Sequence, residues 1–131
     1  MNPENLEKIF SALNAAGVRY LVVGGIAVMA HGYLRMTRDL DIVVSLDGEN
    51  PAQALQVFAA LGYQPNVPVE LMDFVDRANR RRWQEEKGMM VYQLVSDSLE
   101  DCPIDIFVEE PIAFTEMYPA RVEYELSDGL I

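Results

Sequence analysis

The amino-acid sequence predicts an α+β fold in which helices lie mainly on one face of a mixed β-sheet. Helix-type and strand-type segments alternate in the first half of the chain. Two strand-type segments then follow one another, Met89 to Val95 and Cys102 to Val108, joined by a polar turn. Because helices and strands stop alternating at this point, a mixed sheet is expected rather than a doubly wound parallel sheet.

The elements of the first half of the chain are delimited by capping residues and glycines. Three helices are expected, each stopped by a glycine: residues 3–16, 26–31 and 50–61. Two apolar runs without helical spacing are expected to be buried strands: Arg19 to Val23 and Leu40 to Val44.

In the second half, Pro65 and Pro68 indicate a loop. Residues 69–82 have helical spacing, with an apolar face formed by Leu71, Phe74, Val75 and Ala78. The two consecutive strands follow, and then a short helix from Pro111 to Met117. Arg121 to Leu126 alternates between polar and apolar residues, as a half-exposed strand does.

Length and composition limit the classes of protein to consider. The 131 residues are expected to form a single domain, residues 1–131, and half of them are hydrophobic, which excludes a disordered chain. The net charge of -11 argues against non-specific binding to nucleic acid or to anionic membranes. Cys102 is the single cysteine, so an intrachain disulfide is excluded, and a cytoplasmic location without a membrane span is expected.

Asp39 and Asp41 are the first residues that indicate chemistry. They flank the start of an expected strand two positions apart, so both carboxylates project from the same side. Two such charges repel unless a cation lies between them, and Mg²⁺ is bound by one or two carboxylates together with substrate phosphates. The preceding pair Gly24 and Gly25 offers backbone N–H groups at a helix start, which suits a phosphate.

A third carboxylate is placed to join this pair. Asp105 lies in an apolar strand on the face opposite to Ile104 and Ile106, and burying it without a partner would be costly. If this strand lies beside the strand of Asp39 and Asp41, three carboxylates converge. That is the outline of a site for two metal ions, with Mg²⁺ expected and Mn²⁺ as the alternative.

These residues carry a family resemblance. The glycine pair, the Asp39-Leu-Asp41 strand and the later Asp105 resemble the nucleotidyltransferase superfamily related to DNA polymerase beta. The finer pattern is similar to small bacterial nucleotidyltransferases of the abortive-infection toxin type, and more loosely to lincosamide and aminoglycoside nucleotidyltransferases. It consists of Gly24-Gly-Ile-Ala, His31-Gly32, Arg35, Thr37 and Asp39-Leu-Asp-Ile.

The resemblance implies a nucleotidyltransferase-like fold and an enzyme that moves a nucleoside monophosphate from a triphosphate such as ATP to an acceptor hydroxyl. Asp39 and Asp41 would bind both metal ions, and Asp105 would bind one and orient or deprotonate the acceptor. Gly24 and Gly25 would contact the phosphates. The acceptor could be a protein, a tRNA or a small molecule. The alternative is a silent nucleotide-binding protein or toxin–antitoxin component with the same fold.

The resemblance also has consequences for partners. Relatives commonly continue into another strand and a basic helix, so part of the cleft is expected to be missing or to come from a protein partner or a second copy of the chain. Nucleic acid as a partner is not favoured by the net charge, although a local basic groove would allow it.

Two sets of arginines can each be interpreted in two ways. Arg35 and Arg38 flank the acidic strand and could be solvated loop charges or contacts to the triphosphate. The cluster Arg77, Arg80, Arg81, Arg82 and Trp83 could be a solvated helix face, or it could hold an RNA or nucleotide acceptor with Trp83 stacked on a base.

Overall fold

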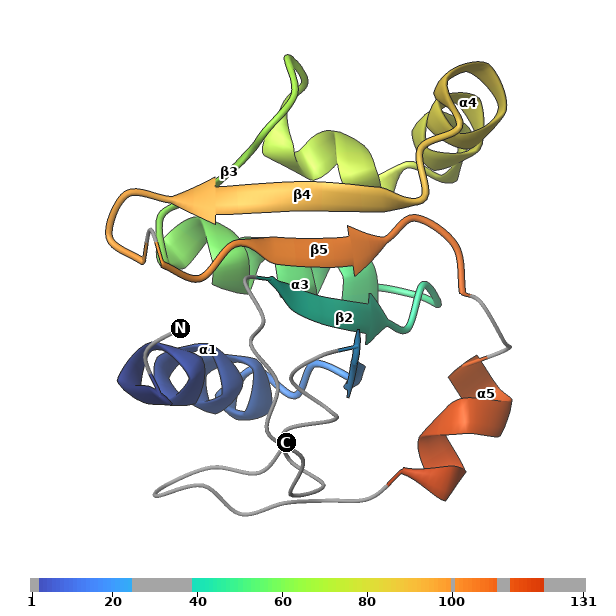
Figure 1. Ribbon diagram of the computed structural model, residues 1–131. Coiled ribbons are helices and arrows are strands. Elements are labelled where there is room, and N and C mark those ends of the chain that lie inside the picture. Colours follow the sequence, from blue (N-terminus) through green and yellow to red (C-terminus); the bar gives the residue numbers. More distant parts are fainter. Residues whose placement is uncertain (1–2, 25–38, 100, 111–113, 122–131) are drawn as a thin grey trace.

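The computed structural model describes residues 3–24, 39–99, 101–110 and 114–121, and it confirms the α+β prediction (Figure 1). Five strands form one mixed sheet in the order β1-β2-β5-β4-β3. Their bounds are β1 Tyr20–Val23, β2 Leu40–Val44, β3 Tyr63–Pro65, β4 Val91–Ser96 and β5 Ile104–Phe107. The helical elements are α1 Pro3–Ala15, α3 Asn50–Ala60, η1 Leu71–Val75, α4 Arg77–Lys87, α5 Phe114–Met117 and η2 Tyr118–Ala120.

The centre of the sheet is a parallel pair, β2 and β5. All other neighbours are antiparallel: β1 with β2, β4 with β5, and β3 with β4. The expected strand pair of the second half is therefore present as β4 and β5. The strand that carries Asp105 lies directly beside the strand that carries Asp41.

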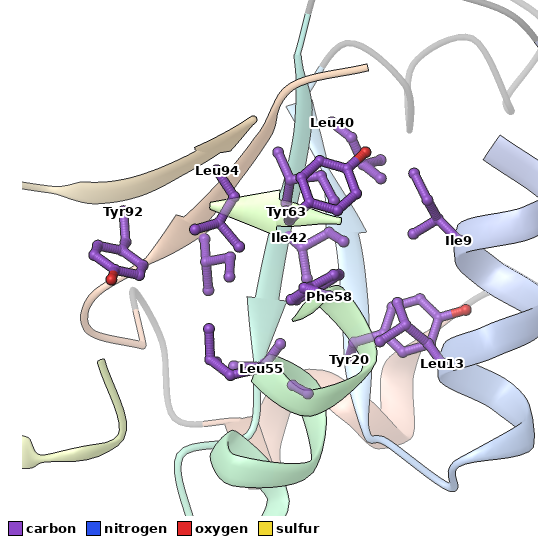
Figure 2. Packing of buried hydrophobic residues seen from close by; sticks show 14 of the residues in the cluster. Ile9, Leu13, Tyr20, Leu40, Ile42, Leu55, Phe58, Tyr63, Tyr92 and Leu94 are labelled. Atoms are coloured by element: carbon purple, nitrogen blue, oxygen red, sulfur yellow. The ribbon is translucent and has the colours of Figure 1, made fainter. Parts of the chain in front are cut away.

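One face of the sheet is buried beneath the helices. Because side chains alternate along a strand, Leu40, Ile42 and Val44 of β2 point to the same side, and all three are buried. They share one hydrophobic cluster with side chains of α1, α3, η1 and α4. Figure 1 shows α3 running behind β2 and β5, and Figure 2 shows Leu40 and Ile42 among side chains of α1 and α3.

A buried asparagine joins the first two strands at one end of the sheet. Asn50 accepts a hydrogen bond from the backbone N–H of Arg19 and donates to the carbonyls of Arg19 and Ser45. Arg19 precedes β1 and Ser45 follows β2, so Asn50 holds the register that pairs Tyr20 with Val44. At the other end of the same ladder, this register brings Val23 opposite Asp41.

The single helix expected over residues 69–82 is wrong, because η1 and α4 are separated at Asp76. Asp76 has an extended backbone (ψ 117°), and its side chain accepts the N–H of Ala78 at 2.8 Å, so it is the N-cap of a new helix. The new helix has a different phase. Ala78 is therefore exposed rather than inward, and Trp83 is buried.

The loop expected at Pro65 contains a short strand. β3 lies at the edge of the sheet, and Pro65 is its last residue, a place where the missing N–H of proline is tolerated. The expected helix 26–31 and residues 122–126 of the last expected strand lie outside the described residues. Within the described residues, no helix has the length and apolar character of a membrane span.

Candidate active site

Asp41 and Asp105 face each other across the two central strands. They are direct partners in the parallel register of β2 and β5, so their side chains emerge on the same face of the sheet. This is the face opposite to the hydrophobic cluster, because the neighbours of Asp105, Ile104 and Ile106, are fully buried. Both carboxylates are only partly exposed.

Asp39 lies one residue before β2 and adds a third negative charge. Burial is the main cause that raises the pKa of the Asp105 carboxyl, and the charge of Asp39 raises it further. Hydrogen bonds from Gln93 and with Asp41 oppose this increase in pKa. The sheet thus holds Asp105 within interaction range of both other aspartates, in an environment that disfavours its ionised form.

Gly24 closes β1 directly against Asp41. Its φ is +70°, a left-handed conformation that favours glycine. A Cβ atom at this position would overlap Oδ2 of Asp41 and lie 3.0 Å from its Cγ. The structure therefore gives Gly24 a role in making room for the carboxylate, while its expected contact with phosphates stays a prediction. Gly25, Arg35 and Arg38 lie outside the described residues.

Gln93 is a site residue that the sequence analysis missed. It lies on β4 opposite Asp105, and its Nε2 donates to Oδ1 of Asp105 at 3.0 Å. Its Oε1 accepts from Nδ2 of Asn66 at 2.9 Å. The available signal was a lone amide on the outward-facing side of an apolar strand, but its partner depends on a pairing between strands that spacing alone does not reveal.

The donor set suits a hard divalent cation, since Asp39, Asp41 and Asp105 supply only carboxylate oxygens. Across the described parts of the chain, however, no group of three or more His, Cys, Asp or Glu side chains is arranged to hold a metal ion. Mg²⁺ is usually bound by one or two carboxylates, water and substrate phosphates rather than by an all-protein cage. The oxygen-only donor set is compatible in its chemistry with such an ion, and binding of Mg²⁺ or Mn²⁺ stays a prediction.

The basic cluster on α4 is partly structural. Trp83 is 4% exposed and stacks on Tyr92 with ring centroids 5.2 Å apart, which contradicts the alternative in which Trp83 stacks on a base. Arg80 is 6% exposed and donates to the carbonyls of Phe74 and Val75, and burial lowers its pKa. Exposed arginines on this helix are Arg77, Arg81 and Arg82.

Acidic residues surround these exposed arginines. A cavity of about 370 Å³ between α4 and the ends of β2 and β5 is lined by arginines and by Asp47, Glu109 and Glu110 together. Arg81 also lies 4.0 Å from Glu85. The mixed charge favours a solvated helix face over a surface for a polyanion.

Cys102 is fully buried, and burial raises the pKa of its thiol to about 11. The thiol therefore stays protonated near neutral pH, which agrees with a packing role rather than a nucleophilic one.

Gly24 follows β1, Asp39 precedes β2 and Asp41 lies within it, in the order expected of a nucleotidyltransferase, and the family comparison assigns the chain to this class. A family model narrows this class. The model for aminoglycoside-2''-adenylyltransferase matches residues 5–83, more than half of the chain, and the chain belongs to this family. A comparison with curated proteins finds no match.

The family match includes Gly24, Asp39 and Asp41 but ends before Asp105 and Gln93. The assignment of Asp105 to the site therefore depends on the pairing of β2 with β5. The match also falls in the aminoglycoside branch, to which the resemblance was looser, and the toxin subgroup stays a prediction.

Proposed function

We propose that this protein is a divalent-cation-dependent nucleotidyltransferase that transfers the AMP group of ATP to a hydroxyl of a small cationic acceptor. The observation that carries the proposal is the register of Asp41 with Asp105 on adjacent parallel strands, in a chain of an adenylyltransferase family. Nucleoside triphosphate as the donor follows from the family. Cation dependence and the acceptor are the parts that need testing.

In the proposed reaction, Asp39, Asp41 and Asp105 would hold divalent cations through their carboxylate oxygens, together with phosphate oxygens of the bound triphosphate. Bound Mg²⁺ would neutralise charge on the phosphates and make the acceptor hydroxyl easier to deprotonate. The acceptor oxygen forms a bond to the α-phosphorus as the bond to the pyrophosphate oxygen breaks. Asp105 takes the proton of the acceptor hydroxyl, a role that fits a carboxylate whose pKa is raised by burial.

The charge of the protein supports a cationic acceptor. A net charge of -11 attracts a polyamine-like sugar and repels a polyanion such as tRNA. The described arginines do not offset this, because acidic side chains lie among them. The family name, which specifies an aminoglycoside acceptor, points the same way.

The test is transfer of label from α-³²P-ATP to a panel of aminoglycosides, with Mg²⁺ or Mn²⁺ and with EDTA as a control. We expect labelled product only with a divalent cation, and a loss of ~100-fold or more in Asp41→Asn. Arg82→Gln, an exposed change on α4, is the matched control and should transfer normally.

Other results separate the remaining alternatives. Label that appears on protein or tRNA but not on aminoglycosides would keep the enzyme and change the acceptor. Calorimetric binding of ATP without transfer to any acceptor would support the silent nucleotide-binding alternative. Transfer that persists in Asp41→Asn would contradict the assignment of the site.

A further inference from the structure

Two consecutive side-chain hydrogen bonds, from Asn66 to Gln93 and from Gln93 to Asp105, connect the far edge of the sheet to the candidate site. We call this pair of bonds the relay. β3, β4 and β5 are successive neighbours in the sheet. One polar residue lies on, or directly after, each of these strands. Asn66 follows β3, Gln93 lies on β4 and Asp105 on β5. Asn66 donates to Gln93 at 2.9 Å, and Gln93 donates to Asp105 at 3.0 Å.

Asn66 contacts the end of the Gln93 side-chain amide that faces away from Asp105 and supports the orientation that the acceptor-only carboxylate selects. The backbone N–H of Asn66 also donates to the backbone carbonyl of Gln93 at 2.9 Å, so Asn66 is anchored to β4 at two points. Because its side-chain NH₂ group donates to Oε1 of Gln93, the NH₂ group of Gln93 is directed to Asp105. Without Asn66, the two orientations of the Gln93 amide would be less strongly distinguished.

The hydrogen bond from Gln93 engages one specific oxygen of Asp105. Oδ1 accepts the bond, and the carboxyl group of Asp105 also has hydrogen-bond contacts with Asp41 and Asp39, which a bound cation would replace. When all three aspartates are ionised, their charges repel one another, so an additional donor is needed to keep Asp105 in one orientation. The side chain of Gln93 is an uncharged donor on β4. It can therefore fix the orientation of Asp105 and leave the negative charge of the aspartates available to a cation.

We propose that Gln93, oriented by Asn66, is the positioning residue of Asp105, and that it holds this carboxylate so that its remaining oxygen can bind a divalent cation together with a nucleotide. This inference rests on the proposed function, since it assigns a role within the same site. It adds two residues that the sequence motif does not contain, and one of them, Gln93, also lies beyond the family match.

The experiment measures binding rather than turnover. The affinity of the full chain for α,β-methylene-ATP is determined by calorimetry with excess Mn²⁺ and again with EDTA. The ratio of the two affinities is the cation-dependent gain in affinity. In Gln93→Met, which keeps the length but removes the donor, we expect this gain to fall ~10-fold, as for residues that orient metal ligands. The affinity in EDTA should not change.

Gln64→Met is the matched control, because Gln64 is an exposed glutamine on the neighbouring strand β3. It should keep the full gain. Asn66→Ala leaves Gln93 in place and should give a smaller loss in the same direction. Thermal unfolding of each variant shows whether it folds, and Asn66→Ala, an exposed change, provides the second route if Gln93→Met does not fold.

The outcomes separate this inference from the proposed function. Suppose that the cation-dependent gain in affinity is lost in Asp41→Asn but unchanged in Gln93→Met and Asn66→Ala. That result would overturn the relay and keep the proposed function. A wild-type chain with no cation-dependent gain would overturn both. Equal losses with Mn²⁺ and with EDTA in Gln93→Met would show a general structural role and also overturn the relay.

Discussion

Gly24 gives the sharpest test of how the site is built, because the structure contains a matched control for it. Gly24 and Gly17 have the same φ of +70°. A Cβ at Gly17 would meet nothing within 4 Å, whereas a Cβ at Gly24 would overlap Oδ2 of Asp41. Replacing each glycine by alanine therefore imposes a similar backbone cost, and Gly24→Ala adds the contact with Asp41.

The expected magnitudes follow from these two contributions. A left-handed conformation costs alanine about 1–2 kcal/mol, so Gly17→Ala should lower the free energy of unfolding by that amount. Steric overlap in a packed position adds about 1–3 kcal/mol, which gives about 2–5 kcal/mol for Gly24→Ala. For a chain of this length, 1 kcal/mol corresponds to about 4 °C in Tm.

The assay is thermal and urea unfolding of both variants, combined with the cation-dependent binding of α,β-methylene-ATP. If the Asp41 carboxylate rotates away from the added methyl group, Gly24→Ala will lose only as much stability as Gly17→Ala. In that case the cation-dependent binding should be lost, because the carboxylate has moved. A Gly24→Ala protein that matches Gly17→Ala in stability and keeps wild-type binding would refute the reasoning.

Three further predictions concern the carboxylate and the basic helix. The pKa of Asp105 is raised in the folded protein, so its ionised form destabilises the fold above that pKa. Asp105→Asn should therefore increase the free energy of unfolding at pH 7 in EDTA, and the increase should shrink as the pH falls towards the ordinary aspartate pKa of about 4. Trp83→Ala should cost about 3–5 kcal/mol in urea unfolding, because it removes a buried stacked ring. Arg80→Met should cost ~2 kcal/mol by the same measurement, because two inward carbonyls lose a charged donor, while the exposed Arg82→Gln should change stability by less than about 0.5 kcal/mol.

Each of these three predictions would be contradicted by a specific result. An Asp105→Asn protein less stable than the wild type at pH 7 would show that the ionised carboxylate is favoured rather than penalised. Trp83→Phe keeps much of the packing, so a selective loss of nucleotide binding in that variant would revive the idea of base stacking. An Arg82→Gln variant as unstable as Arg80→Met would contradict the division between buried and exposed arginines.

Local features of the sequence predicted the fold where they mark the ends of elements. Gly17 and Gly62 follow α1 and α3 as expected, and the bounds of β2 agree with the prediction. The fold class was predicted because the change from alternating elements to consecutive strands is visible in the residue pattern. The break at Asp76 was missed, although aspartate is a preferred N-cap, because the apolar spacing on both sides resembled one helix.

The site was predicted only as far as neighbouring residues determine it. That Asp39 and Asp41 share a side was expected from the alternation of a strand, and it stays a prediction because Asp39 lies just before β2. That Asp105 lies beside Asp41 depends on the order of the strands, and that Gln93 lies beside Asp105 depends on the register of β4 with β5. Such long-range pairings result from the packing of the whole sheet and have no local signature.

The parallel contact between β2 and β5 determines when the site can form during synthesis. α3, β3, η1, α4 and β4 all lie between these strands in the chain. A nascent polypeptide that has emerged only as far as β4 carries Asp41 but has no partner strand on that side, so the closing of this long loop comes late. A chain that ends before β5 should therefore lack the pairing of Asp41 with Asp105, so the candidate site is completed only when β5 has joined the sheet.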